Sequence, residues 1–463
     1  MSFIFSLLSL GVIGIFFILL GIRRARYEYS VMELVSLSFF VGIGFACYQL
    51  FLYYLLGIDY SLGHIVIVPL VLFIMVFSRY IAKPQKLKDF MPVDNAGGRW
   101  GMTERLLVAA LIVQVLWTVF LVVPTPVHSH DAVANYALKA KIFYFAAGVP
   151  DGFFAWGEAA VAHPDYPLLL PFLMTWIYVF TGFNDLIVNM IMPVIYLAFL
   201  ILFYSQMKKS FSRQYSLILV FILATIPQLA DYATIIHTDL ILTALVTCAF
   251  VYFLLYVRTG NRMPLVLSVL LFGFSLWTKN EAIVFAGAFV AVLFACIARA
   301  EPARRKRALV DAAISLLIVT VIAAPWFAVR FSNTAVNSDI DFSRLTPERL
   351  WQNVKDIPVL LDLFQQEIFG PKKWNIFWVL VFAGIIWKRK MLGKGECFYA
   401  ALFLALSVAG YFAGYMCTTG YNLYFYVNTT ISRFMLHFCG IALVFLAYLF
   451  KDDYREISGS TPR

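Results

Sequence analysis

The sequence predicts an all-α polytopic membrane protein with about 13 transmembrane helices. Its 463 residues are 62% hydrophobic and only 13% charged, whereas soluble chains carry about 25% charged residues. Apolar runs long enough to cross a bilayer recur from one end of the sequence to the other. This distribution excludes a soluble domain with one membrane anchor.

The predicted spans are apolar runs that approach the ~20 residues a bilayer requires. The run from Ser2 to Ile22 has no basic residues before it and no small-residue cleavage site, so it is interpreted as a first span and not a signal peptide. The spans lie at 2–22, 31–56, 61–81, 106–127, 186–206, 215–236, 240–257, 264–278, 282–298, 309–329, 374–387, 398–417 and 434–450.

The basic residues set the predicted orientation. If the N-terminus lies outside and each span crosses once, the basic clusters share one side, and cytoplasmic loops are enriched in Lys and Arg. The net charge of +10 is then explained by topology, and a nucleic-acid partner is excluded. The C-terminus is expected in the cytoplasm. The clusters lie at 23–26, 79–105, 208–213, 258–262, 299–307, 388–394 and 451–463.

One apolar run, from Pro167 to Gly182, is not counted as a span, because counting it would invert every later basic cluster. We expect a re-entrant or juxtamembrane helix there, which protein can cover at membrane depth. The chain then divides into N-terminal spans with a cytoplasmic loop, a core with an extracytoplasmic loop at 128–166, a second extracytoplasmic loop, and C-terminal spans with a cytoplasmic tail. These regions are 1–105, 106–330, 331–373 and 374–463.

The first extracytoplasmic loop contains the most polar stretch between spans, from His128 to Lys141. The absence of Pro and Gly from 132 to 147 predicts a helix that stops at Gly148. Ser129 or Asp131 would cap its start, and Asp131, Asn135 and Lys139 would share a face. A carboxylate at a helix N-terminus stays ionised, so Asp131 suits a general base or a metal ligand; the alternative is that it is only the cap.

Further ionisable residues fall on the same predicted side. His163-Pro-Asp165-Tyr-Pro is stiffened by proline and would hold His163 and Asp165 at the mouth of the apolar helix; the alternative is a rigid entry loop. Asp239 lies between two spans, where it could cap a helix. All six histidines also fall at or near this side.

Two cations on this side suit a phosphate. Lys279 interrupts an apolar stretch, where it would bind phosphate or balance Glu281. Arg433 precedes the last predicted span and would bind phosphate or reach lipid headgroups. Ionisable groups near membrane depth usually face a bundle interior or a wet cavity, so the sequence predicts one outward-facing site.

These motifs resemble those of the membrane glycosyltransferases with the GT-C fold, which include the lipid A aminoarabinose transferase and the protein O-mannosyltransferases. Two departures stand out: the first loop has Asp131-Ala where an acidic pair is common, and Pro-Asp-Tyr-Pro-Leu replaces Pro-Pro-Leu. The similar motifs are Asp131, Tyr136-Ala-Leu-Lys-Ala-Lys with Gly148, His163-Pro-Asp-Tyr-Pro-Leu, Thr238-Asp239-Leu-Ile-Leu, Trp277-Thr-Lys279-Asn-Glu and Pro325-Trp326.

The resemblance implies transfer of a sugar from a polyprenyl-phosphate carrier to a glycan, lipid or protein acceptor on the extracytoplasmic face of a bacterial or archaeal plasma membrane. Asp131 would be the general base or a metal ligand. Lys279 and Arg433 would neutralise the phosphate leaving group. Asp239 would hold the acceptor, order the loop or assist the metal. The other expected substrate-binding residues are His163, Asp165 and Lys139.

A metal ion stays open at this stage. No HExxH or CxxC pattern occurs, and the six cysteines are scattered in the manner of small buried hydrophobes. A divalent cation, Mg²⁺ or Mn²⁺ ahead of Zn²⁺, would use Asp131, His130 and Asp239. The loop from 332 to 373 would add acceptor contacts or be a solvated cover, and its polar or aromatic residues are Asp339, Asp341, Arg344, Arg349 and Trp351.

Two alternatives share this architecture. A secondary transporter or lipid flippase would have a similar number of spans and broken helices. However, no internal duplication is evident, and the ionisable residues gather at one face instead of the midplane. A glycan polymerase or ligase with a lipid-diphosphate donor would also use an outer loop, and the sequence does not separate it from a glycosyltransferase.

Overall fold

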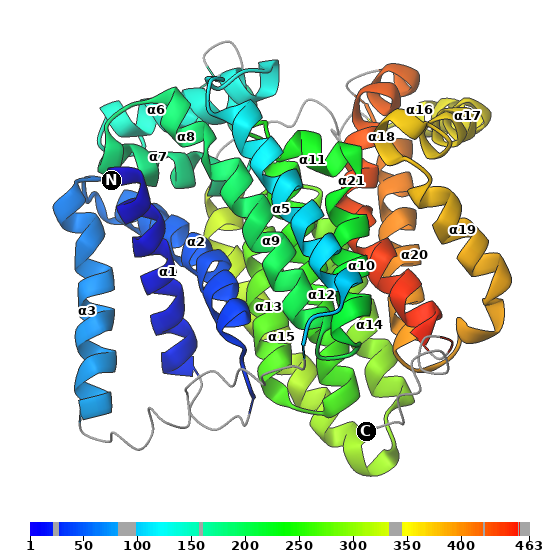
Figure 1. Cartoon of the computed structure of the whole chain (residues 1–463). Coiled ribbons are helices and arrows are strands. Elements are labelled where there is room, and N and C mark those ends of the chain that lie inside the picture. Colours follow the sequence, from blue (N-terminus) through cyan, green and yellow to red (C-terminus); the bar gives the residue numbers. More distant parts are fainter. Residues whose placement is uncertain are drawn as a thin grey trace.

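The computed structural model describes residues 1–21, 27–81, 99–156, 161–332, 345–419, 422–451 and 453. Within these residues the regular structure is helical throughout, which confirms the predicted all-α membrane fold. Most helices run side by side along one bundle, and short helices cover one end of it, which we call the upper end (Figure 1).

The bundle helices correspond to the predicted spans. They are α1 (Ser2–Gly21), α2 (Val31–Leu56), α3 (Leu62–Ile81), α5 (Met102–Val122), α9 (Ile191–Met207), α10 (Arg213–Ala224), α12 (Thr238–Thr259), α13 (Arg262–Ser275), α14 (Ala282–Arg299), α15 (Pro302–Ser332), α19 (Phe377–Trp387), α20 (Gly395–Met416) and α21 (Leu423–Leu449).

The short elements of the upper end come from the two predicted extracytoplasmic loops and from breaks between spans. They are the π-helical turn η1 (Ala132–Ala137), α6 (Leu138–Phe145), the 3-10 turn η2 (Phe153–Ala155), α7 (Leu169–Thr181), α8 (Asp185–Asn189), α11 (Pro227–Tyr232), α16 (Pro347–Lys355), α17 (Ile357–Ile368) and α18 (Pro371–Trp374).

The described residues contain nine helices long and apolar enough to cross a membrane, with α8 and α9 counted as one. The chain is therefore a multi-pass membrane protein. The other predicted spans correspond to shorter apolar helices, α3, α10, α13 and α19. The count of about 13 stays a prediction, because length and composition alone do not place these four across a bilayer.

Two predicted spans differ most from the helices that form. The span at 215–236 is broken after α10, because Pro227 cannot donate to a helical ladder and disfavours helix at Ile226, which is extended. The last span was predicted to start at 434, whereas α21 begins at Leu423. Arg433 therefore lies within a helix and not before it.

The helix predicted in the first loop also differs in detail. It begins as the π-helical turn η1 and continues as α6, so its start carries an extra residue per turn, as is frequent at functional sites. The left-handed residue at its end is Ala147, with a φ of 49°, and not Gly148. Asn135 and Lys139 share a face as predicted, while Asp131 points to other partners.

The apolar run at 167–182 forms α7, which lies with α6 and α8 at the upper end instead of running along the bundle (Figure 1). It is buried against α1, α2 and α6. The backbone N–H of Leu169 donates to the carbonyl of Trp277 over 3.0 Å. The start of α7 is thereby tied to the break that follows α13.

Ion pairs join helices at the end of the bundle opposite to the upper end. Their basic members belong to clusters that the sequence predicts as cytoplasmic, and each pairs with a buried or largely buried carboxylate. Other members of these clusters, such as Arg23, Arg24, Arg26, Lys83, Lys86 and Lys88, lie outside the described residues. The pairs are Lys209–Glu33, Arg213–Glu104, Arg262–Asp311 and Lys451–Glu396.

Helices α1 and α2 approach each other backbone to backbone. A Cβ placed on Gly42 would overlap with the carbonyl oxygen of Leu10, and one placed on Gly14 would overlap with that of Ser38. Small residues allow this close approach between membrane helices. The glycines are therefore required by packing.

We predict that Gly42→Ala lowers the melting temperature of the detergent-solubilised protein, because overpacking costs about 1–3 kcal/mol. Gly11→Ala is the matched control on α1, since nothing lies within 4 Å of a Cβ at that position. The control should keep or raise the melting temperature. Equal melting temperatures for the two variants would contradict the close approach.

Candidate functional site

Asp239 is a fully buried carboxylate surrounded by donors, in the first turn of α12. Its Oδ1 accepts from His437 Nε2 at 3.0 Å and from Lys279 Nζ at 3.1 Å, and Arg433 Nε lies 3.3 Å away. Its Oδ2 accepts from His237 Nδ1 at 2.7 Å. A buried charge is tolerated only when it is paired and hydrogen-bonded, and Asp239 meets both conditions.

The donors to Asp239 come from three parts of the chain: the segment before α12, the break between α13 and α14, and one face of α21. His237 precedes α12, and Lys279 lies in the break between α13 and α14, where its Nζ is also 3.2 Å from Glu281 Oε1. Arg433 and His437 are four residues apart on α21 and so share a helix face. The Nδ1 of His437 lies 2.8 Å from the hydroxyl of Tyr411. Since Nε2 donates to Asp239, Nδ1 accepts from that hydroxyl.

Asp131 lies at the edge of the same group and reaches solvent, with 42% of its side chain exposed. Its Oδ2 is 2.9 Å from Arg433 Nη1 and 3.6 Å from His237 Nε2. Burial acts to raise the pKa of Asp131, but the charges of Arg433 and His237 outweigh it and hold the pKa below its usual value.

Asp131 occupies the N-cap position of η1, but its side chain does not cap the helix that follows. Its carboxylate makes no capping hydrogen bond to the described backbone, and Ser129 Oγ accepts from the N–H of Ala132 at 3.4 Å instead. The alternative interpretation, that Asp131 serves only as a helix cap, is therefore wrong. Its side chain is held by long-range partners on other helices.

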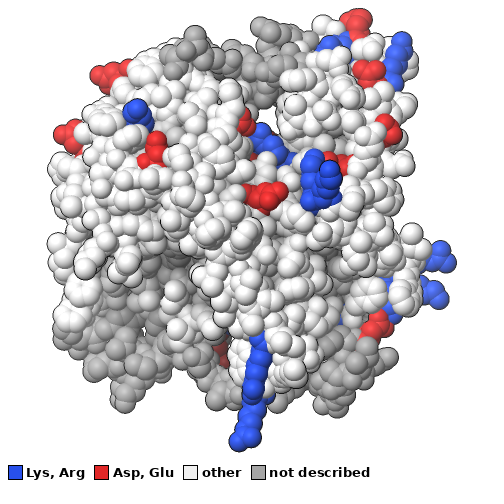
Figure 2. All heavy atoms as spheres, turned by 45° about the horizontal axis from the view of Figure 1, so that its top comes forward, with Lys and Arg blue, Asp and Glu red and all other residues white. Residues whose placement is uncertain are grey.

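The four residues predicted from separate motifs, Asp131, Asp239, Lys279 and Arg433, thus form one group at the upper end. Figure 2 shows acidic and basic side chains next to one another in the middle of this face. We call the group the Asp239 cluster, and its seven members are Asp131, His237, Asp239, Lys279, Glu281, Arg433 and His437.

Sequence reasoning did not assign His237, Glu281 and His437 to the site. The signal that could have found them was the gathering of all histidines toward one side, together with the spacing of four residues between Arg433 and His437. Their contacts join four segments that are far apart in the chain, so no local pattern identifies them.

Lys139, His163 and Asp165 form a separate group beside the Asp239 cluster. Lys139 is fully buried, and its Nζ donates to Asn135 Oδ1 and to the carbonyl of His163, both at 2.6 Å. The ring of His163 stacks on Tyr166. Burial lowers the pKa of Lys139 to about 7, against the opposing charge of Asp165. Lys139 therefore fastens the His163 loop to η1 and α6.

The described residues contain no group of three or more His, Cys, Asp or Glu side chains that could hold a metal ion by themselves. Of the candidate ligands, His130 is 91% exposed with its Nδ1 3.5 Å from Asp131 Oδ1. Asp239 is occupied by its four donors. Among the three predicted ligands, Asp131 is thus the one with a solvent-accessible carboxylate.

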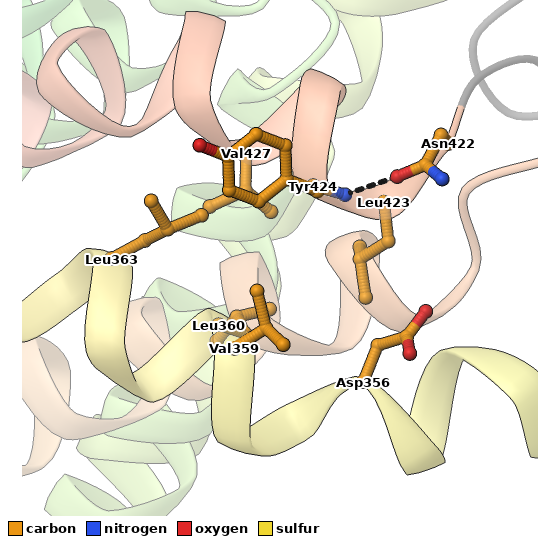
Figure 3. A pocket seen from close by; sticks show the side chains of 8 residues that line it. All are labelled: Asp356, Val359, Leu360, Leu363, Asn422, Leu423, Tyr424 and Val427. Atoms are coloured by element: carbon orange, nitrogen blue, oxygen red, sulfur yellow. Dashed lines mark hydrogen bonds between the residues drawn. The ribbon is translucent and has the colours of Figure 1, made fainter.

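The second predicted loop contributes a cavity away from this cluster. A cavity of about 280 Å³ lies between α17 and the start of α21, where the backbone N–H of Tyr424 donates to Asn422 Oδ1 (Figure 3). Arg349 and Trp351 lie on α16, and Asp339, Asp341 and Arg344 lie outside the described residues. Acceptor contacts from this loop stay a prediction. The cavity is lined by Asp356, Val359, Leu360, Leu363, Asn422, Leu423, Tyr424 and Val427.

Residues 165–326 match a family model described as dolichyl-phosphate-mannose-protein mannosyltransferase. The match supports the resemblance to GT-C enzymes, and with the helical fold it supports a multi-pass membrane glycosyltransferase of the GT-C type. It spans about a third of the chain and includes Asp239 and Lys279, while Asp131 and Arg433 lie outside it. A search of curated proteins and a search of solved structures each found no match.

We predict that Asp239→Asn destabilises the protein far more than Asp131→Asn. The first change leaves Lys279 and Arg433 without their buried counter-charge, which costs about 3–5 kcal/mol. The second affects a partly exposed pair worth about 1 kcal/mol or less. Thermal unfolding followed by tryptophan fluorescence in detergent measures both, and equal losses would contradict the central place of Asp239.

A second prediction concerns the buried amine of Lys139. Its pKa is lowered to about 7 in the folded protein and is about 10.4 in an unfolded chain. Between these values the unfolded state binds more protons, so this group makes stability rise with pH. The melting temperature of the wild type should therefore rise relative to that of Lys139→Met from pH 7 to pH 9. Parallel curves would show that Lys139 is not buried as an amine.

Proposed function

We propose that this enzyme transfers a sugar from a polyprenyl-phosphate carrier to the hydroxyl of a glycan, lipid or protein acceptor. The single observation that supports it most is the Asp131–Arg433 pair, a solvent-reaching carboxylate 2.9 Å from a guanidinium. The family whose model matches takes its name from a dolichyl-phosphate sugar donor and a protein acceptor. For this chain, the donor class is inferred from that name and from the paired charges.

Arg433 is the better placed of the two cations to meet the donor phosphate. Its side chain is 20% exposed, and a guanidinium can bind two phosphate oxygens at once. Lys279 is 2% exposed and is engaged by both Asp239 and Glu281. We therefore assign phosphate binding to Arg433, and assign Lys279 the positioning of the two carboxylates around it.

Asp131 would act as the general base. The acceptor O–H gives its proton to the Asp131 carboxylate, the acceptor oxygen forms a bond to the anomeric carbon, and the bond from that carbon to the phosphate oxygen breaks. The polyprenyl phosphate leaves with its negative charge facing Arg433. Every proton and electron pair is accounted for without a further reactant.

The ion pair also gives donor binding a role in activating the base. Arg433 holds the pKa of Asp131 below its usual value, which makes the free carboxylate a weak base. A donor phosphate that engages Arg433 adds negative charge and draws the guanidinium away, and both changes raise the pKa of a carboxylate. Asp131 would become an effective base only when the donor is present.

Charge balance supports a divalent cation as part of the proposal. The three carboxylates of the Asp239 cluster already offset the charges of Lys279, Arg433 and His237, so a phosphate would enter a site with no excess positive charge. Mg²⁺ commonly binds through one or two carboxylates plus substrate phosphate and water, and the Asp131 carboxylate fits that limited donor set, whereas the imidazole of His130 would suit Zn²⁺. Such a cation would supply extra charge at the phosphate.

We place this reaction on the extracytoplasmic side of a bacterial or archaeal plasma membrane. The site is at the upper end, and the ion pairs formed by the predicted cytoplasmic basic clusters are at the opposite end. Positive charge is retained on the cytoplasmic side. The lipid of the donor would remain in the bilayer while its phosphosugar reaches the cluster.

The test is transfer of a labelled sugar from a polyprenyl-phosphate donor in proteoliposomes. Asp131→Asn should reduce turnover by a factor of about 10² to 10⁴, the usual contribution of a general base, with little change in melting temperature. Asp362→Asn changes an exposed carboxylate on α17 and is the matched control. Intact transfer by Asp131→Asn would refute the assignment.

The same assay in detergent separates the enzyme from the transporter or flippase alternative. Transport has no meaning in micelles, so glycosyl transfer there requires catalysis by the protein. A donor series of polyprenyl-phosphate and polyprenyl-diphosphate sugars then separates a glycosyltransferase of the proposed kind from a polymerase or ligase. Use of the diphosphate donor alone would refute the proposed donor class.

A further inference from the structure

A second polar group, which the proposed reaction does not use, lies beside the Asp239 cluster. Arg330 at the end of α15 donates from Nη1 to Asn280 Oδ1 at 3.0 Å, and its Nη2 is 3.7 Å from Asp165 Oδ2. Trp326 lies four residues before Arg330 and so shares its helix face. We call Asp165, Asn280, Trp326 and Arg330 the Arg330 cluster.

Several polar atoms of this cluster are buried without a hydrogen-bond partner among the described residues. These atoms are the two carboxylate oxygens of Asp165, the Nδ2 of Asn280 and the Nε1 of Trp326. Asp165 is 2% exposed and Trp326 is 1% exposed. An unsatisfied buried polar group is costly, so native proteins rarely retain one without a ligand, an ordered water or a catalytic role.

The unpaired atoms have the chemistry of sugar recognition. A sugar hydroxyl donates one hydrogen bond and accepts others, so neighbouring hydroxyls can donate to the Asp165 carboxylate and accept from Asn280 and Trp326. Burial raises the pKa of Asp165, although Arg330 and Lys139 oppose it. Its carboxylate is therefore poorly solvated and would gain from hydroxyl donors.

The charges favour a neutral ligand over a phosphate. The negative charge of Asp165 offsets that of Arg330. Lys139 is the other nearby cation, and it already donates to Asn135 and to the carbonyl of His163. A phosphate would meet the carboxylate of Asp165 at close range, whereas an uncharged polyol would not be repelled.

The position of the cluster connects it with the reaction centre. Asn280 directly follows Lys279, which contacts Asp239, so the two clusters meet at one peptide bond. The hydrogen bond from Leu169 to the carbonyl of Trp277 fixes the loop that carries Asp165 against the same break. A ring held by Asn280 and Asp165 would thus lie beside the Asp131–Arg433 pair.

We propose that the Arg330 cluster binds the hydroxyl groups of a neutral sugar ring, supplied by the donor or by the acceptor of the transfer. This inference rests on the proposed function for its biological setting, but the binding itself does not require catalysis. Asp165 accepts from two hydroxyls, while Asn280 and Trp326 donate. Arg330 orients Asn280 and Asp165.

The test is saturation-transfer NMR on the detergent-solubilised protein with a panel of methyl glycosides, including methyl α-mannoside. Trp326→Phe removes the Nε1–H and keeps an aromatic ring, and Asp165→Asn keeps the side-chain shape. Each should weaken glycoside binding by about tenfold, as expected for one lost hydrogen bond to a ligand. Trp387→Phe and Asp362→Asn alter exposed residues of α19 and α17 and should bind as the wild type does.

Several results would overturn the proposal. These are the absence of glycoside signals from the wild type, which would indicate that the cluster holds water, or equal signals from the wild type and Trp326→Phe. Displacement of the glycoside by inorganic phosphate would indicate an anion site instead. If Asp165→Asn fails to fold, Trp326→Phe alone decides.

Transfer kinetics identify which substrate supplies the sugar. Trp326→Phe should raise the KM for the donor alone if the donor sugar occupies the cluster, or the KM for the acceptor alone if the acceptor does. An unchanged KM for both would count against the site. Glycoside binding is measured without catalysis. If Asp131→Asn remained active, the proposed function would be refuted, but the result for the Arg330 cluster would still stand.

Discussion

The buried charge of Asp239 is the constraint on which the arrangement of the upper end depends. A carboxylate with no exposed surface must be surrounded by donors, and these come from the segment before α12, the break between α13 and α14, and the face of α21. The three parts of the bundle are thereby held in register. Arg433 then extends from this buried group to Asp131, so the solvent-exposed edge of the cluster is positioned by its buried centre.

The two carboxylates of the cluster differ in burial, so one is held rigidly while the other stays accessible to a substrate. Asp239 has four donors and no exposure, which suits it to hold Arg433 and Lys279 in place. Asp131 shares only the outer nitrogen of Arg433 and is 42% exposed. Its ion pair can be broken by a competing anion at small cost, because partly exposed pairs contribute little. In the proposed reaction, a substrate phosphate would therefore change the protonation of Asp131 without disturbing Asp239.

The sequence predicted the helical membrane fold and the gathering of polar groups at one end of the bundle, because apolar run length and basic clusters are local signals. It also named Asp131, Asp239, Lys279 and Arg433, which the structure brings together. It missed His237 and His437, whose roles depend on contacts between distant helices. It placed Lys139 and Asp165 with the others, whereas they form a separate group. Proximity in three dimensions does not follow from shared sidedness.

The break between α13 and α14 connects the Asp239 cluster with the Arg330 cluster. Lys279 and Asn280 are consecutive, yet one faces the charged centre and the other faces Arg330. In a continuous helix, consecutive side chains point about 100° apart around one axis. This fixed angle would limit how two neighbouring residues could each reach a different cluster. The non-helical turn removes this restriction, and α7 holds it through the hydrogen bond of Leu169 to Trp277. Movement of this turn would shift Lys279 and Asn280 together, so the proposed phosphate site and the proposed sugar site would keep or lose their geometry as one unit.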